Sequence, residues 1–189
     1  MIQKIGQRRK EVNICIYGAS SQKISPAYLE EAMRLGEALG NARHRLVFGG
    51  GLTGMMGAVA EGFQKAGAEI VGVAPTFFCI PGVLLENCND FIYTETMRER
   101  KQVMEDLSDA FVALPGGIGT LDELFEIMTL RQLGRHEKPV FLYNCDGFFD
   151  GLLDYLNTLA QEQFMAPLSE QELFRVVRTP EELLEHLKN

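Results

Sequence analysis

The chain has 189 residues, of which 46% are hydrophobic, 18 are lysine or arginine and 26 are aspartate or glutamate. This composition is typical of a globular protein and excludes a disordered chain. The net charge of −8 and the absence of a basic block argue against binding to nucleic acid or to an anionic membrane.

The cysteines at positions 15, 79, 88 and 145 form no C-x-x-C pair, and the chain has only three histidines. We therefore expect no metal site, and free thiols in a reducing cytoplasm. The polar and basic stretch 1–11 has no apolar segment of a signal peptide, and no apolar run approaches the ~20 residues of a membrane helix. These features predict a cytoplasmic protein.

The first half of the chain alternates apolar strand-like runs with helical patterns. Strands are predicted over 12–17, 46–48, 70–74 and 91–93. A first helix follows Ser25 and Pro26, which suit its N-cap and first turn, and Gly40 is predicted to end it. Further helices are expected from the methionines at 55 and 56 to about Gly67, and from Thr94 to about Leu107. The irregular segment 75–89 is expected to border a site.

The second half continues the alternation. Strands are predicted over 110–114, 139–143 and 173–177, and helices from Thr120, over about 148–163, and after the capping box at 179–182. Strands that alternate with helices predict parallel βαβ units. We therefore predict an α/β fold, a Rossmann-like doubly wound parallel sheet with helices on both faces. A single domain is expected over 1–189, with 1–11 a flexible or helical extension.

Three turns rich in glycine or serine, at 18–21, 49–54 and 115–120, follow predicted strands and lead into helices. In such a sheet ligands bind beyond the carboxyl ends of the strands, where helix N-termini attract anions. We therefore predict Gly18, Ser20, Gly50 and Gly51 as substrate-binding residues. The simpler alternative is that these glycines only allow the chain to turn.

The second turn also contains the pattern G-x-G-x-x-G at Gly49, Gly51 and Gly54. A dinucleotide site of this type has an acidic residue about 20 positions later, at the end of the next strand. Here that strand ends in V-A-P-T at 73–76, without an acid. The pattern therefore disfavours a nicotinamide or flavin cofactor, and no cofactor is predicted.

Arg100 lies within an apolar helical stripe formed by Met97, Val103, Met104 and Leu107. A buried guanidinium needs a partner, because an unpaired buried charge is costly. It is either part of a structural ion pair, or its stem packs while its charge reaches solvent, or it is directed at a phosphate or carboxylate in a cleft.

Glu123 admits two interpretations. Thr120 and Glu123 have the spacing of a capping box, in which the glutamate only accepts a hydrogen bond from the N-cap amide. Alternatively, a carboxylate in the first turn of this helix faces the ligand crevice at the edge of the sheet. The same helix, Leu121–Leu133, is apolar on two sides, which predicts that a second subunit covers it in a homodimer or higher homo-oligomer.

Two motifs make the sequence more specific. M-R-E-R-K at 97–101 and P-G-G-I-G-T-L-D-E at 115–123 closely resemble the paired R-K and P-G-G-x-G-T-x-x-E motifs of the Lonely Guy family. The resemblance covers about residues 12–165 and includes 49–57 and 132–140. That family consists of cytokinin riboside 5′-monophosphate phosphoribohydrolases, although its members are often labelled lysine decarboxylases.

The resemblance implies that Arg100 and Glu123 are the catalytic pair. It also implies that the 5′-phosphate lies against Gly116, Gly117, Ile118, Gly119 and Thr120, and that Met97, Lys101 and Thr129 line the substrate pocket. Two positions depart from the family. The first turn reads Y-G-A-S at 17–20, where C-G-S-S is usual, and Gly82 replaces an acidic residue that plant-type members carry.

The function that the resemblance implies is hydrolysis of the N-glycosidic bond of a nucleoside 5′-monophosphate, with release of a base and ribose 5-phosphate. The base is adenine or an N6-modified adenine. No metal or cofactor takes part. The alternative is a carrier of the same fold that binds a nucleotide or the molybdenum cofactor without turning it over, although pure binding would not need a carboxylate near an anionic ligand.

Overall fold

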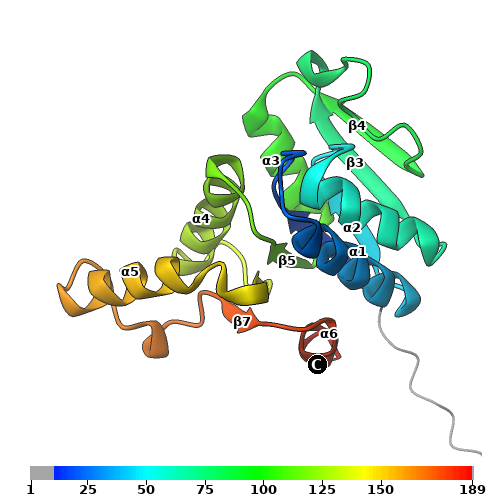
Figure 1. Ribbon diagram of the computed structural model, residues 1–189. Helices are drawn as coiled ribbons and strands as arrows, with labels where there is room; N and C mark the ends of the chain where they lie inside the picture. The colour runs from blue at the N-terminus through cyan, green and yellow to red at the C-terminus, as the bar shows by residue number, and fades with distance from the viewer. Residues whose placement is uncertain (1–10, 189) are drawn as a thin grey trace, which may run out of the picture.

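The computed structural model describes residues 11–188, and their strands form one parallel sheet in the order β4-β3-β2-β1-β5-β6-β7 (Figure 1). The strands are β1 (Asn13–Tyr17), β2 (Arg45–Phe48), β3 (Ile70–Pro75), β4 (Asp90–Thr94), β5 (Ala110–Ala113), β6 (Val140–Tyr143) and β7 (Arg175–Val177). The helices are α1 (Pro26–Asn41), α2 (Gly54–Lys65), α3 (Met97–Leu107), α4 (Ile118–Gln132), α5 (Asp150–Gln161) and α6 (Pro180–His186).

Helices cover both faces of the sheet. Alternate residues of β1 point to opposite faces, so Ile14 and Ile16 pack with α1, α2 and α6, whereas Cys15 and Tyr17 pack with α3, α4 and α5. Figure 1 shows α1 and α2 on one side of the sheet and α4 on the other. This arrangement confirms the predicted α/β doubly wound fold.

The strand order determines where a ligand crevice lies. The chain runs outward from β1 through β2 and β3 to β4, and α3 then crosses back to β5 on the other side of β1. The connections on the two sides of β1 therefore diverge, and a crevice opens beyond the carboxyl ends of β1 and β5. Two of the three glycine- or serine-rich turns follow these strands.

Gly40 does not end the first helix as predicted, because α1 continues to Asn41 and Gly40 is buried. The reason is the contact between α1 and α2. A Cβ atom on Gly36 would lie 2.1 Å from the carbonyl oxygen of Val59, and one on Gly40 would lie 2.6 Å from the Cβ of Ala66. The two glycines therefore allow the helices to pack closely, and the turn that follows is made instead by Arg43, with φ of 67°.

Two predicted helix starts are shifted. α3 begins at Met97, not at Thr94, because β4 extends to Thr94 and Thr96 caps the helix by accepting a hydrogen bond from the Glu99 amide. α4 begins at Ile118, with Gly117 at its N-cap. Thr120 therefore lies inside the first turn, and the capping-box interpretation of Glu123 is wrong.

The capping box predicted at 179–182 is confirmed, because Thr179 accepts a hydrogen bond from the Glu182 amide at 3.2 Å. The carboxylate of Glu182 in turn accepts one from the Arg178 amide at 2.7 Å. The assignment of 1–189 to one domain stays a prediction. Its proposed extension, 1–11, lies outside the described residues except for Glu11.

Candidate active site

A cavity of about 530 Å³ lies where the three glycine- or serine-rich turns meet. The turn after β1 supplies residues 18–22, the turn after β2 supplies Gly49, Gly51 and Thr53, and the first turns of α4 supply Gly117, Gly119 and Thr120. The segment after β3 and the helix α3 close the remaining sides. The three turns that the sequence singled out therefore line one site.

Arg100 and Glu123 form an ion pair in the wall of this cavity. Nη1 of Arg100 lies 2.7 Å from Oε1 of Glu123, and the two residues are only 6% and 7% exposed. Nε of Arg100 also donates a hydrogen bond to the Val73 carbonyl oxygen at 3.1 Å. Because Arg100 comes from α3 and Glu123 from α4, the pair depends on how these helices pack on the sheet.

The electrostatics of Glu123 reflect two opposing effects. Burial raises the pKa of the Glu123 carboxyl above its ordinary value, while Arg100 beside it favours the ionised form. Burial is the larger effect, so the pKa is raised overall. The site thus holds a carboxylate with little solvation, which interacts strongly with any positive charge that develops next to it.

Gly49 is a site residue that the sequence analysis did not select. A Cβ atom at this position would lie 1.9 Å from Nη2 of Arg100, so only glycine leaves room for the guanidinium. The Arg100 side chain therefore explains why the first position of the G-x-G-x-x-G pattern is glycine, and no dinucleotide is needed to account for it. The pattern itself was visible in the sequence, but its partner is 51 positions away and could not be inferred.

Most of the predicted site residues line this one cavity, among them the predicted catalytic pair. They are Gly18, Ser20, Gly51, Met97, Arg100, Gly117, Gly119, Thr120 and Glu123. Five others do not line the cavity, namely Gly50, Lys101, Gly116, Ile118 and Thr129. Thr129 lies exposed on α4, nine residues beyond Thr120, which corresponds to about 14 Å along a helix.

The segment between β3 and β4 borders the site, as expected from its composition. Two backbone hydrogen bonds join it to the turn after β2. The Leu52 amide donates to the Val83 carbonyl at 2.9 Å, and the Leu85 amide donates to the Gly50 carbonyl at 2.8 Å. Phe78, Val83 and Leu84 contribute apolar side chains to the cavity, which the sequence had not identified. Gly82, where plant-type relatives were expected to carry an acid, also lies in this wall.

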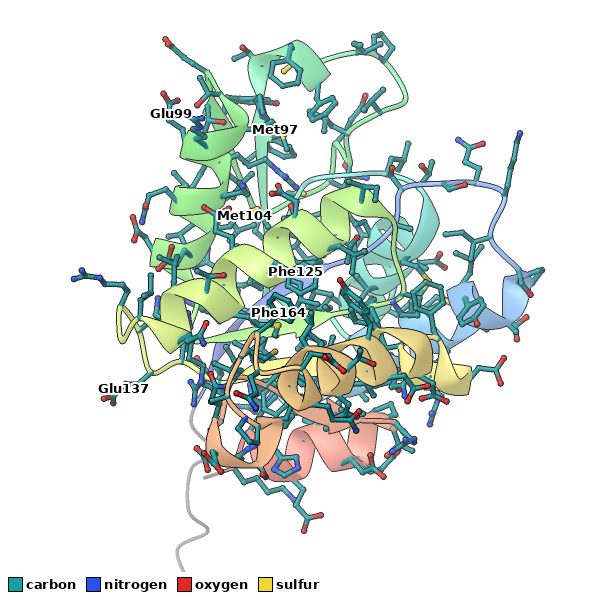
Figure 2. The ribbon with its side chains drawn as sticks, turned by 90° about the vertical axis from the view of Figure 1, so that its left-hand side faces the viewer. Met97, Glu99, Met104, Phe125, Glu137 and Phe164 are labelled. Atoms are coloured by element: carbon teal, nitrogen blue, oxygen red, sulfur yellow. The ribbon has the colours of Figure 1, made fainter. Side chains whose placement is uncertain are left out.

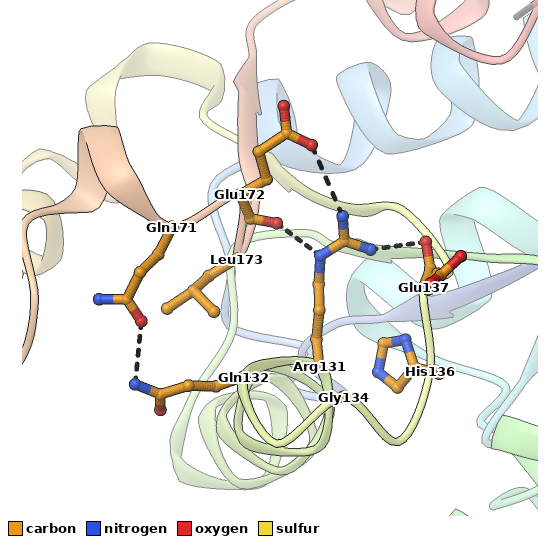
Figure 3. Close-up of a pocket in the computed structure, with 8 residues that line it drawn as sticks. All are labelled: Arg131, Gln132, Gly134, His136, Glu137, Gln171, Glu172 and Leu173. Carbon is orange, nitrogen blue, oxygen red and sulfur yellow. Dashed lines mark hydrogen bonds and ion pairs between the residues drawn. The ribbon is translucent and has the colours of Figure 1, made fainter.

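A second hollow, of about 330 Å³, lies near the other end of α4 (Figure 3). The guanidinium of Arg131 in this hollow donates hydrogen bonds to the backbone carbonyl oxygens of Glu137, Lys138 and Glu172, so its donors are used within the protein. These bonds join the end of α4 to the segments before β6 and β7. We therefore assign Arg131 a structural role and place the chemistry in the first cavity.

Within residues 11–188, no cluster of three or more histidine, cysteine, aspartate or glutamate side chains is arranged to hold a metal ion. No helix of this part of the chain has the length and apolar character required to cross a membrane.

Sequence comparisons assign the chain to a family. Residues 56–187 match the family model described as "Possible lysine decarboxylase". A cytokinin riboside 5′-monophosphate phosphoribohydrolase of Mycobacterium tuberculosis is 41% identical over 160 residues, which span 85% of each chain. An enzyme of the same name from Arabidopsis thaliana is 36% identical over 182 residues, 96% of this chain and 84% of the relative.

The chain belongs to the Lonely Guy family. The decarboxylase description of the family model does not fit this member. Decarboxylation of an amino acid by pyridoxal phosphate requires a lysine that forms a Schiff base with the cofactor. Within residues 11–188, no lysine lines the cavity, and Lys101, the nearest in sequence to the predicted catalytic pair, forms ion pairs with carboxylates of α4.

Solved structures show how widely the fold of this Lonely Guy protein is shared. A molybdenum cofactor binding protein from Rippkaea orientalis superposes with a TM-score of 0.69 at 24% identity, covering 95% of this chain and 96% of the other. At this level of identity the likeness shows the fold alone. The site must therefore be interpreted from its own residues.

Proposed function

We propose that the protein hydrolyses the N-glycosidic bond of an adenosine 5′-monophosphate, plain or N6-modified, to the free base and ribose 5-phosphate. The observation that carries this proposal is the buried Arg100–Glu123 pair in the wall of a cavity lined by three glycine- or serine-rich turns. The names of the curated relatives support the same reaction. No metal or cofactor takes part in the proposed reaction.

The 5′-phosphate is proposed to bind at the N-terminus of α4. The N-cap, Gly117, has no side chain to occupy the free amides of the first turn, and Gly117, Gly119 and Thr120 line the cavity. Free amides and the positive end of the helix dipole favour a phosphate there. Anchoring the phosphate fixes the ribose near Glu123, which lies one turn further along the same helix.

Cleavage of the glycosidic bond places positive charge on the sugar in the transition state. The Glu123 carboxylate stabilises that charge and orients or deprotonates the attacking water. Arg100 favours the ionised form of Glu123 and balances negative charge on the phosphate or the departing base. The low exposure of both side chains strengthens these interactions, because little water screens them.

The base is proposed to lie toward the apolar part of the cavity, formed by Met56, Phe78, Val83, Leu84 and Met97. This wall accommodates adenine and an apolar N6 substituent, as in a cytokinin. We also propose that the protein works in the cytoplasm, where its buried free cysteines, Cys15 and Cys145, stay reduced.

The proposed function predicts that the purified protein releases adenine or N6-modified adenine from the 5′-monophosphate and acts poorly on the nucleoside. The reason is that the phosphate supplies the main binding energy and orients the sugar. Chromatography of the reaction mixtures measures base release from both substrates. Equal turnover of adenosine and AMP would contradict the role of the phosphate, and tight binding of the nucleotide without release of base would indicate a carrier.

We further propose that two copies of the chain form at least a dimer through α4. Leu124, Ile127 and Met128 cover the sheet, whereas Phe125 of the same helix and Leu133 at its C-cap are 38% and 65% exposed. Phe164, 82% exposed, and Phe125 are labelled in Figure 2, which views this side of the molecule. Because Thr129 is exposed on α4 and far from the cavity of its own chain, a dimer would also allow it to approach the partner's site.

The dimer predicts that Phe125→Asp, or the introduction of a charge at Leu130, weakens assembly, because a charge is costly in an apolar interface. Light scattering at micromolar concentration should give a dimer or larger species for the unmodified protein and a smaller mass for the variant. Tyr93→Asp is the matched control, since Tyr93 is an aromatic residue, 55% exposed, on the edge strand β4. A monomeric unmodified protein would refute the proposal.

A further inference from the structure

Lys101 follows Arg100 on α3, but its side chain contacts α4 and not the cavity. Its Nζ atom lies 3.1 Å from Oδ2 of Asp122 and also forms an ion pair with Glu126, and the side chain is 17% exposed. The two carboxylates are one helical turn apart and lie on either side of Glu123 in the sequence. Two consecutive cations of α3 thus pair with three acids of α4.

Lys101 and Glu123 also share a second, much smaller cavity, of about 10 Å³, with Tyr17, Glu105, Glu126 and Ile127. Such a volume holds no more than about one water molecule. Glu123 therefore borders two spaces: the large cavity, which Arg100 also lines, and the small one, which Lys101 also lines. A substrate in the large cavity would meet Arg100 and Glu123 but not the ammonium group.

We propose that Lys101 is a positioning residue for Glu123 and not a ligand of the substrate. It would act by neutralising Asp122 and Glu126 and by joining α3 to α4, which keeps the carboxylate of Glu123 ionised and opposite the substrate. This inference rests on the proposed function, and it replaces the substrate-binding role that the family resemblance implies for Lys101.

The charges around Glu123 indicate how the effect would arise. Arg100, Lys101 and Glu105 face it from α3, Asp122 and Glu126 come from α4, and Cys15 and Tyr17 come from β1. Burial raises the pKa of Cys15 to about 12 and that of Tyr17 well above its ordinary value, so both stay neutral. Loss of the Lys101 charge would leave Asp122 and Glu126 uncompensated and raise the pKa of Glu123 further.

Lys101→Met tests the inference through the pH dependence of kcat/KM. Glu123 must be ionised to act, so the acidic limb should move to higher pH, by at least about half a unit, and kcat should fall at pH 6. KM for AMP should change by less than about twofold, because no contact with the substrate is lost. Lys101→Arg, which keeps the charge, should restore most of kcat.

A charge-compensated variant separates this role from simple damage to the fold. Lys101→Met combined with Glu126→Gln restores the net charge of the group without altering a residue of the large cavity. The acidic limb of this double variant should return toward that of the unmodified protein. Lys65→Met is the matched control, because Lys65 pairs with Glu61 on α2 and its loss should leave the pH profile unchanged.

Other results would overturn the inference. If Lys101 contacts the phosphate, Lys101→Met should raise KM for AMP by about tenfold or more, leave the acidic limb in place, and gain nothing from Glu126→Gln. If the unmodified protein releases no base, the proposed function fails, and calorimetry of AMP binding decides the role of Lys101. An unchanged Kd in Lys101→Met then supports the positioning role, and a tenfold weaker Kd contradicts it.

Discussion

Replacing Glu123 with glutamine is expected to lower kcat by on the order of 10² or more while the protein still folds. Glutamine preserves the shape of the side chain and removes its negative charge, which in the proposed mechanism stabilises the positively charged sugar. Because α4 starts at Ile118, Glu123 has no capping role that could explain such a loss. Single-turnover release of base from AMP, together with the circular dichroism spectrum of the variant, measures both parts of the expectation.

The remaining non-catalytic explanation is that Glu123 serves only as the structural partner of Arg100. In that case Glu123→Gln would alter stability but retain most of its base-releasing activity, and the proposed mechanism would be wrong. The pH dependence gives an independent check. Since burial raises the pKa of Glu123, the acidic limb of kcat/KM in the unmodified protein should lie above the ~4.3 of an ordinary glutamate.

The same shift has a defined effect on stability. The pKa of Glu123 is higher in the folded than in the unfolded protein, so the folded state binds the proton more tightly. The resulting stabilisation is complete below the unfolded-state pKa and is lost as the pH rises through the folded-state pKa. The free energy of unfolding of the unmodified protein, measured with urea, should therefore increase relative to that of Glu123→Gln as the pH falls below neutrality.

Arg100→Ala is expected to abolish most of the turnover, with a loss in kcat/KM on the order of 10² to 10³. It also removes the partner of a carboxylate that is 7% exposed, and breaking a buried ion pair from one side costs about 3 kcal/mol of unfolding free energy. Denaturant unfolding and base release measure the two effects. Near-normal turnover in a folded Arg100→Ala protein would exclude a catalytic role for the guanidinium.

Gly49→Ala is a control that changes the position of Arg100 without changing any charge. The new methyl group would lie 1.9 Å from Nη2, so the guanidinium must move away from its observed place beside Glu123. Activity should fall in the same direction as in Arg100→Ala. Gly151→Ala on α5 is the matched substitution, because its Cβ would meet no atom within 4 Å, and it should leave activity unchanged.

Local sequence patterns were sufficient to predict the fold and much of the site. Strand and helix periodicities depend on neighbouring residues, so all seven strands and the alternating helices could be identified, with shifts of a few residues at their ends. The turns at 18–21, 49–54 and 115–120 could be assigned to one edge of the sheet, because the carboxyl ends of parallel strands meet there. The two motifs were also enough to indicate the family.

Contacts between distant elements were decided only by the tertiary structure. Whether Glu123 caps α4 or pairs with Arg100 depends on where the helix begins and on how α3 crosses back over the sheet. The need for glycine at position 49 comes from the guanidinium of α3, and Lys101 turns toward α4 although it is adjacent to Arg100. Sequence periodicity gives the face of a helix on which a residue lies, but the partner on that face is set by the packing of the whole sheet.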